Sequence, residues 1–331
     1  MNEPIFIARQ DTLEQEILPA HWLSQYKLFG EESYTFQDKE IWKKLCMSRA
    51  AANDRDMHGE ALEEMLTTFS AEHTGKWMLL VYGMDAAVLE GLVTMAAIAA
   101  NGTAMAAVAG NALLMHAITN SQTAMASIAA SSAAMTAIAV SAVAMNAIGG
   151  NSIARDAISA SSYYDANIKE NDMAIAKLVV GFANLESARY SGCAGMAADS
   201  TAMTAVAASS TAMTAVAASA TAMGKIAAVD AALSKLAAST TAMDALYARK
   251  KQMKGGSASK SGKFIILEIS QSNAFNTSKY GYATLSDGSK PDWSSYLAKY
   301  AFFQKYPKYA TYMLNDTDSD DYIYYFDIAS P

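Results

Sequence analysis

The central part of the chain repeats one pattern of apolar and small residues every ten positions. A branched aliphatic residue follows the repeated methionine by three places, as Ile98 follows Met95, and alanine fills most of the remaining positions. The methionine series is Met95, Met105, Met115, Met125, Met135 and Met145, then Met203, Met213, Met223 and Met243, with Leu233 in one place. Because Ala and Met favour helix and residues three apart share a helical face, each unit is predicted to be helical.

A period of ten does not fit one continuous helix. Ten residues at about 100° each stop about 80° short of three turns, so the apolar stripe would wind rapidly around the rod. Most units carry a preferred N-cap residue four positions before the methionine position. These residues are Asn101, Asn111, Ser121, Ser131, Ser141, Asn151, Ser209, Ser219 and Ser239. The sequence therefore favours short, capped helices that turn and stack into a solenoid, with a trimeric coiled-coil shaft as the alternative.

The composition divides the chain into six segments. They are an N-terminal attachment or capping domain (1–90), the first decapeptide array (91–161), a charged interruption (162–200), the second array (201–247), a Lys/Gly/Ser linker (248–262) and an aromatic-rich β tip domain (263–331). The apolar run 264–269 is typical of a buried strand. The predicted fold class is mainly α with a small C-terminal β-rich (α+β) domain, built around an elongated repeat of short helices.

Charge is distributed unevenly along the chain. The formal net charge is -7, yet no Asp, Glu, Lys or Arg occurs from Gly91 to Ala154. Such a segment is expected to be buried in an assembly or to lie in a membrane. Its frequent Asn and Ser residues argue against membrane insertion. The basic residues at 249–263 alternate with Gly and Ser, which is typical of a solvated linker. With no broad basic face, no nucleic-acid partner is expected.

Catalytic and metal-binding patterns are not evident in the sequence. We find no phosphate-binding loop, no Ser/His/Asp arrangement and no paired carboxylates in a plausible cleft, so we predict neither enzyme activity nor a cofactor. Cys46 and Cys193 stand alone, which indicates neither a disulfide framework nor a zinc site. The acidic run 315–321 offers Asp316, Asp318 and Asp320 as candidate calcium ligands. It lacks the glycine and the later glutamate of an EF-hand loop, so a solvated turn is favoured.

Tyrosine is concentrated near the C-terminal end. Ten of the 17 tyrosines follow residue 279. Tyrosine combines a large contact area with a hydroxyl group, which suits recognition surfaces and stacking on sugars. The candidate receptor-binding residues are Tyr280, Tyr282, Trp293, Tyr296, Tyr306, Tyr309 and Tyr312. The alternative role for these side chains is to pack the core of a small β-rich domain.

The order of these segments resembles the tail fibre or receptor-binding proteins of tailed bacteriophages. The Ala-Met-x-Ala-Ile/Val array carries most of the resemblance and covers about half of the chain. The resemblance implies a homotrimer in the virion tail, made in the host cytoplasm. It also implies an N-terminal anchor on a tail or baseplate protein and a C-terminal tip that binds a bacterial surface glycan or protein.

Two other functions remain open from the sequence. One is a purely structural tail or virion component without receptor binding. The other is an ice-binding or surface-associated repeat protein, suggested by Thr201, Thr204, Thr211 and Thr214.

Overall fold

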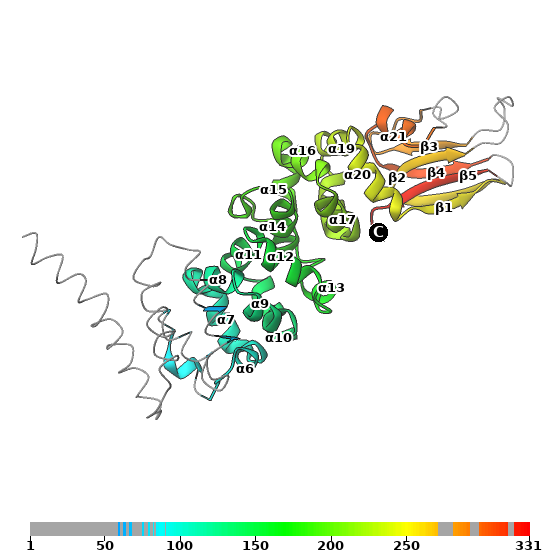
Figure 1. Ribbon diagram of the computed structural model, residues 1–331. Helices are drawn as coiled ribbons and strands as arrows, with labels where there is room; N and C mark the ends of the chain where they lie inside the picture. The colour runs from blue at the N-terminus through cyan, green and yellow to red at the C-terminus, as the bar shows by residue number, and fades with distance from the viewer. Residues whose placement is uncertain are drawn as a thin grey trace, which may run out of the picture. The chain divides into compact units, whose positions relative to one another are not determined.

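The computed structural model describes most of the chain from residue 91 onward. The described residues are 84–89, 91–270, 281–291, 298–316 and 321–331, with Gly59, Leu62, Glu63, Leu66, Thr67, Gly75, Leu79 and Tyr82. The chain divides into two compact units, Met1–Ile168 and Lys169–Pro331. The described residues of these units form short helices and one antiparallel sheet, so the predicted class, mainly α with a small C-terminal β domain, is confirmed (Figure 1). Most of the predicted N-terminal domain lies outside the described residues.

In the first unit, each decad forms one short helix. The elements are η2 (Ala86–Leu89), α6 (Met95–Ala100), α7 (Gly102–Gly110), α8 (Ala112–Thr119), α9 (Gln122–Ala129), α10 (Ser132–Ala139), α11 (Ala142–Gly149), α12 (Ser152–Ser159) and α13 (Tyr164–Asn167). Consecutive helices bend by 99° between α7 and α8 and by 97° between α10 and α11. The coiled-coil alternative is therefore wrong for these residues.

The helices pack with a period of three. Helix α6 contacts α9, α7 contacts α10, α8 contacts α11 and α9 contacts α12. Three decads thus make one turn of a solenoid, as favoured by the sequence. The repeated methionine and aliphatic side chains fill its interior, and Met105, Met135 and Ile138 are 0% exposed. A single chain is sufficient to bury this core.

The predicted N-cap residues all cap helices. In each case the side-chain oxygen accepts a hydrogen bond from the backbone N–H three residues later, at Ala104, Leu114, Ala124, Ala134, Ala144, Ala154, Ala212, Ala222 and Ala242. These bonds satisfy one of the N–H groups that the first turn of a helix leaves without an intrahelical partner. The cap positions therefore fix where each helix begins.

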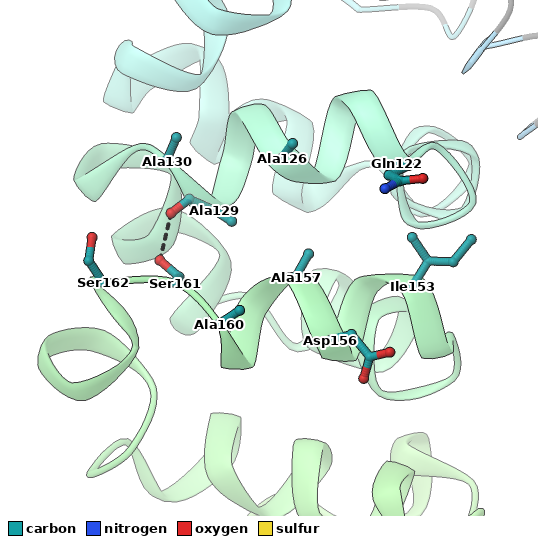
Figure 2. A pocket seen from close by; sticks show the side chains of 10 residues that line it. All are labelled: Gln122, Ala126, Ala129, Ala130, Ile153, Asp156, Ala157, Ala160, Ser161 and Ser162. Atoms are coloured by element: carbon teal, nitrogen blue, oxygen red, sulfur yellow. Dashed lines mark hydrogen bonds between the residues drawn. The ribbon is translucent and has the colours of Figure 1, made fainter.

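Serine side chains at the helix junctions also join successive turns of the solenoid. Each hydroxyl donates to a backbone carbonyl oxygen 32 residues earlier in the chain. That carbonyl lies near the end of a helix in the preceding turn of the solenoid. In the first unit the bonds run from Ser131 to Ala99 (2.6 Å), from Ser141 to Ala109 (2.5 Å) and from Ser161 to Ala129 (2.6 Å; Figure 2). The last carbonyls of a helix lack intrahelical partners, so the hydroxyl satisfies one of them. We call these serines, with Ser239 of the second unit, the cap ladder.

The second unit begins with the same helical packing. Its elements are α14 (Asp172–Phe182), η3 (Ser187–Arg189), α15 (Cys193–Ala198), α16 (Ser200–Ala208), α17 (Ser210–Ala218), α18 (Ala220–Ala227), α19 (Asp230–Ala237) and α20 (Thr240–Ala248). Helix α14 contacts α17, α15 contacts α18, α16 contacts α19 and α17 contacts α20. Part of the predicted interruption at 162–200 therefore packs within this solenoid. The Ser239 hydroxyl donates to the Ala207 carbonyl at 2.5 Å, which continues the cap ladder.

A five-stranded sheet follows α20. Its elements are β1 (Lys251–Lys254), β2 (Ala258–Ser270), β3 (Tyr282–Leu285), α21 (Ala301–Lys305), β4 (Ala310–Asn315) and β5 (Tyr322–Asp327). The strand order is β1-β5-β2-β4-β3 and all pairings are antiparallel. The first half of β2 pairs with β4 and the second half with β5. One face carries the core, which includes Phe264, Ile266, Met313 and Ile323 together with Phe302 of α21.

The predicted linker at 248–262 is corrected by the structure, because it contains β1 and the start of β2. Lysines in this segment lie against aromatic rings that come from distant parts of the chain. The Lys254 ammonium lies 5.7 Å from the centre of the Tyr322 ring, and the Lys260 ammonium donates to the Tyr325 hydroxyl at 2.9 Å. The glycines and serines form the turn between the strands, where Gly256 has φ 86°. The composition of residues 248–262 resembles that of a linker, but pairing with the distant strands β4 and β5 makes this segment part of the sheet.

Candidate functional site

The predicted receptor-binding residues do not form one cluster. Tyr282, Tyr306, Tyr309 and Tyr312 are described, whereas Tyr280, Trp293 and Tyr296 lie outside the described residues. Tyr282 on β3 and Tyr312 on β4 come together, with ring centroids 5.8 Å apart. The Lys290 ammonium lies 5.1 Å from the centre of the Tyr282 ring. Tyr282 and Tyr312 are half-buried on the sheet face opposite the core, and we call them the Tyr282 pair.

The other two described candidates have different surroundings. Tyr306 packs against the sheet core, with its ring centroid 5.3 Å from that of Phe302, so the core-packing alternative holds for this residue. Tyr309 is half-buried, and the Lys263 ammonium lies 5.5 Å from the centre of its ring. Thus Tyr282 and Tyr312 remain as the predicted residues that share a surface.

A second and longer aromatic surface was not predicted. Four rings follow one another in the order Tyr300, Tyr247, Tyr324 and Tyr322, with centroid separations of 5.7, 6.2 and 6.2 Å. Tyr247 lies in the last turn of α20, Tyr300 immediately precedes α21, and Tyr322 and Tyr324 lie on β5. Since residues two apart in a strand share a face, Tyr322 and Tyr324 point away from the core that contains Ile323. We call these four residues the tyrosine strip.

Three exposed lysines, Lys250, Lys254 and Lys299, place their ammonium groups over the tyrosine strip. The distances from Nζ to the ring centroid are 4.1 Å from Lys250 to Tyr247, 4.1 Å from Lys299 to Tyr247, 4.5 Å from Lys299 to Tyr300 and 5.7 Å from Lys254 to Tyr322. An ammonium group at this distance is attracted by the negative face of the ring. The strip therefore combines aromatic surface with positive charge.

Two carboxylates hold the hydroxyl groups at the solenoid end of the strip. Tyr247 donates to Glu268 at 2.5 Å, and Tyr300 donates to Asp244 at 2.5 Å. Burial, the hydrogen bond to Glu268 and its charge raise the pKa of Tyr247 to about 12. The hydrogen bond from Tyr300 is the main cause that lowers the pKa of Asp244, and the bond and charge of Lys299 add to it. At neutral pH the hydroxyls are therefore donors and Asp244 is ionised.

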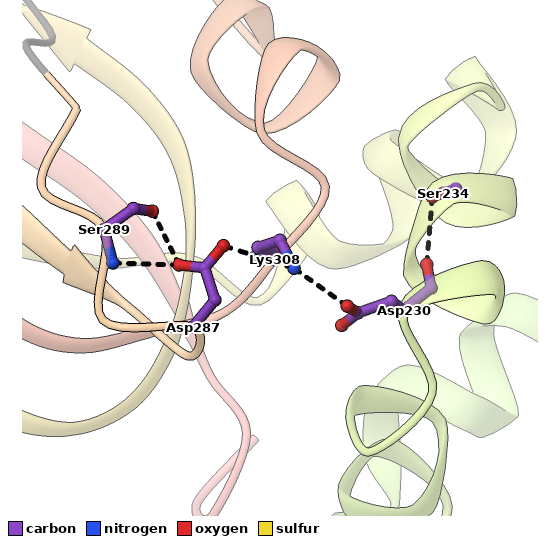
Figure 3. Close-up of polar contacts among 5 residues, drawn as sticks. All are labelled: Asp230, Ser234, Asp287, Ser289 and Lys308. Carbon is purple, nitrogen blue, oxygen red and sulfur yellow. Dashed lines mark hydrogen bonds and ion pairs between the residues drawn. The ribbon is translucent and has the colours of Figure 1, made fainter.

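A further polar contact joins the solenoid to the sheet. Lys308 lies between Asp230 of α19, at 2.8 Å, and Asp287 of the turn after β3, at 3.4 Å (Figure 3). Hydrogen bonds from the hydroxyl and the backbone N–H of Ser289, together with Lys308, lower the pKa of Asp287 to about 2. The sheet is thus fixed to α19 and α20 by contacts on separate elements.

Sequence reasoning missed the tyrosine strip, although two signals were present. The alternation of Tyr322 and Tyr324 in a predicted strand places both on one face. Tyr247 also breaks the repeat, because alanine occupies the same position in the preceding decads, as at Ala227 and Ala237. Those alanines are buried. The last decad has no further helical turn above it, so a large side chain fits there and meets the sheet.

The candidate calcium ligands are only partly described. Asp316 accepts a hydrogen bond from the Ser257 hydroxyl at 2.6 Å, while Asp318 and Asp320 lie outside the described residues. In the part of the chain that the structure describes, no three His, Cys, Asp or Glu residues are grouped to hold a metal ion. Cys193 is buried, and its burial, followed by the charge of Asp172, raises the pKa of the thiol.

A groove between α9 and α12 has a floor of alanine side chains, including Ala126 and Ala157 (Figure 2). Gln122, Ile153 and Asp156 line one end of it. Asp156 is the acidic residue of this lining, and the other members are small or uncharged. The groove offers contact surface but brings together no acid–base pair or nucleophile.

The threonines of the second array do not share one flat face. Helices α16 and α17, which carry them, are bent by 101°. The hydroxyls of Thr204 and Thr214 donate to carbonyls of their own helices, each at 2.8 Å. Residues one solenoid turn after these two are Ser234 and Asp244. The geometry therefore disfavours a regular threonine lattice of the kind that ice binding needs.

No single helix in the described ranges is long and apolar enough to cross a membrane. Three bent pairs of consecutive helices pass the same test by length and composition only. These pairs are α7 with α8, α10 with α11, and α16 with α17.

Comparison with protein-family models gives no match to this chain, and comparison with curated proteins gives none either. Function is therefore inferred from the fold and the surfaces described above.

Proposed function

We propose that the protein is a structural and adhesive protein whose helical solenoids carry a C-terminal sheet domain that binds a receptor. The observation that carries the proposal is the aromatic surface of the sheet domain, which holds the Tyr282 pair on the sheet and the tyrosine strip where β5 meets α20. Half-buried tyrosines present a large contact area at small cost in side-chain entropy. Following the resemblance described above, the proposed setting is the tail of a tailed bacteriophage, with residues 1–90 as the attachment to a tail or baseplate protein.

The solenoids suit the role of a scaffold. Helices of the solenoids contact neighbours in sequence, as α7 contacts α8, and helices one turn away, as α7 contacts α10. Such a stack can be lengthened by adding decads without redesigning the core. The homotrimer implied by the resemblance would form through outer surfaces, since Met135, Met213 and the equivalent residues are already buried within one chain.

A second candidate function is a purely structural tail or virion component, in which the sheet only caps the solenoid. The contacts of Asp230 with Lys308 and of Asp244 with Tyr300 favour this role. A repeat array needs a terminal cap to cover its last apolar face. The two candidates differ in whether the outer face of the sheet binds anything.

The test is the binding of the full-length protein to bacterial cells and to an array of bacterial surface glycans. We expect the unsubstituted protein to bind. A variant in which Tyr282, Tyr312 and Tyr324 are all replaced by alanine should lose this binding while its far-UV circular dichroism spectrum stays unchanged. The matched control is Thr311→Ala, an exposed position on β4. Normal particle assembly with no binding to cells, glycans or surface proteins would favour the purely structural candidate.

A further inference from the structure

We propose that the β1 end of the tyrosine strip binds an acidic saccharide, meaning a sugar polymer that carries carboxylate or phosphate groups. The residues are Lys250, Gln252, Lys254, Tyr322 and Tyr324. This inference rests on the proposed receptor-binding role of the sheet domain and gives it a specific location and ligand class.

Strand pairing brings these side chains onto one face. Lys254 lies opposite Tyr322 and Gln252 lies opposite Tyr324 in the register of β1 and β5. The two tyrosine rings are nearly parallel, with an interplanar angle of 21° and centroids 6.2 Å apart. The Lys254 ammonium lies 5.7 Å from the centre of the Tyr322 ring, and the Lys250 ammonium lies 5.7 Å from that of Tyr324. Two ammonium groups thus accompany a stacked aromatic pair, with an exposed amide at Gln252.

The charges on this surface are not neutralised within the described part of the chain. Lys251 pairs with Asp327 and Lys299 pairs with Asp244. Lys250 and Lys254 instead have aromatic partners, and no ion pair is found for either within the described residues. The segment 249–263 contains six basic residues and no acidic one. An anionic ligand is therefore the complement of this surface.

The mixture of groups favours a saccharide over a nucleic acid. The Gln252 amide and the tyrosine hydroxyls can donate and accept hydrogen bonds, which matches sugar hydroxyl groups. Glu268 lies opposite Tyr324 in the pairing of β2 with β5, so a carboxylate shares this face. This carboxylate accepts a hydrogen bond from the Tyr247 hydroxyl at 2.5 Å, at the solenoid end of the strip. Nucleic acid carries a phosphate at every residue and needs a broad basic face, which the net charge of -7 does not indicate.

The experiment measures the affinity of the full-length protein for acidic bacterial polysaccharides by isothermal titration calorimetry. One arm compares a uronic-acid polymer with its carboxyl-reduced form, and the other compares a phosphorylated polysaccharide with its dephosphorylated form. The variant is Lys250→Gln with Lys254→Gln. The matched control is Lys225→Gln with Lys305→Gln, which removes two exposed lysines from α18 and α21.

We expect an acidic polymer to bind and its neutral form to bind about tenfold more weakly or not at all. The double variant should lose about tenfold in affinity, the control should match the unsubstituted protein, and added salt should weaken binding. Equal affinity for neutral polymers, for single-stranded DNA or for the double variant would overturn the inference. Adhesion to cells that survives in the double variant would overturn it while leaving the proposed function standing. Absence of adhesion in the unsubstituted protein would overturn both.

Discussion

Replacing Ser131 by alanine removes two hydrogen bonds from one side chain. The Ser131 hydroxyl accepts from the backbone N–H of Ala134 at 3.3 Å and donates to the carbonyl of Ala99 at 2.6 Å. The first bond caps α10, and the second joins the junction between α9 and α10 to the end of α6, which lies one solenoid turn before α9. Ala99 is 0% exposed, so water does not replace the lost donor.

The expected destabilisation follows from these two bonds. Loss of a serine cap costs about 1 kcal/mol. A buried carbonyl left without a donor costs about 1–3 kcal/mol more. The variant should therefore lose about 2–4 kcal/mol of unfolding free energy. For a unit of this size, about 1 kcal/mol corresponds to about 2–4 °C, so the Tm should fall by about 5–15 °C.

Neighbouring substitutions separate the two contributions in thermal melts followed by far-UV circular dichroism. Ser132→Ala is the matched control, because Ser132 is exposed and its side chain makes no hydrogen bond with the described residues; its effect should be within about 0.5 kcal/mol. Ser131→Asn should be tolerated, since an amide both accepts and donates. Ser131→Asp keeps the cap but loses the donor, so it should fall between alanine and asparagine. Equal Tm values for Ser131→Ala and Ser132→Ala would refute the ladder.

Three further predictions concern the core, the junction and the strip. Met135→Ala should lower the free energy of unfolding by about 2–5 kcal/mol. Val140→Ala should change the Tm little, because Val140 is 72% exposed. Equal Tm values for the two variants would contradict the proposed core. The pKa of Asp287 is lowered from 3.8 to about 2. Its contribution to the free energy of unfolding is therefore present above about pH 4 and is lost as pH falls towards 2. Asp287→Asn should therefore reduce the loss of Tm between these pH values, and an unchanged loss would argue against the contact with Lys308. The pKa of Tyr247 is raised to about 12, so ultraviolet titration of Tyr247→Phe should lack one tyrosine that ionises near pH 12.

The sequence predicted the helical part in detail because its signals are local. A helix N-cap is recognised from one residue and the apolar pattern that follows it. Asn101 and Ser141 illustrate this, since each caps a helix at the predicted position. The mismatch between ten residues and whole helical turns also favoured separate helices over one rod. Periodicity within one decad was sufficient for these inferences.

The features that the sequence did not predict depend on residues far apart in the chain. The cap ladder joins positions 32 residues apart, which requires knowing that three decads make one turn. The strand at 251–254 is ordered by β5, about 70 residues later in the chain. The tyrosine strip likewise joins Tyr247 of α20 to Tyr300 and Tyr324. Local composition at Lys250 and Lys254 indicates only a basic, flexible segment.

The cap ladder gives a physical reason for part of the uncharged composition between Gly91 and Ala154. Aspartate caps helices as well as serine or asparagine does, but an ionised carboxylate cannot donate to the carbonyl of the preceding turn. The described aspartate cap, Asp199, has a different arrangement, because the Tyr190 hydroxyl donates to it at 2.9 Å.

Two glutamates from outside the decads accept hydrogen bonds at the start of a helix. Glu63 accepts hydrogen bonds from the Ser121 hydroxyl at 2.5 Å and from the Thr123 hydroxyl at 2.7 Å, at the start of α9. Burial alone would raise the pKa of Glu63, but these bonds lower it. Glu170 takes the same role at the start of α18, where it accepts from the backbone N–H of Thr221 at 2.8 Å. At the ladder positions the side chain donates to a carbonyl of the preceding turn, which favours serine and disfavours an ionised carboxylate there.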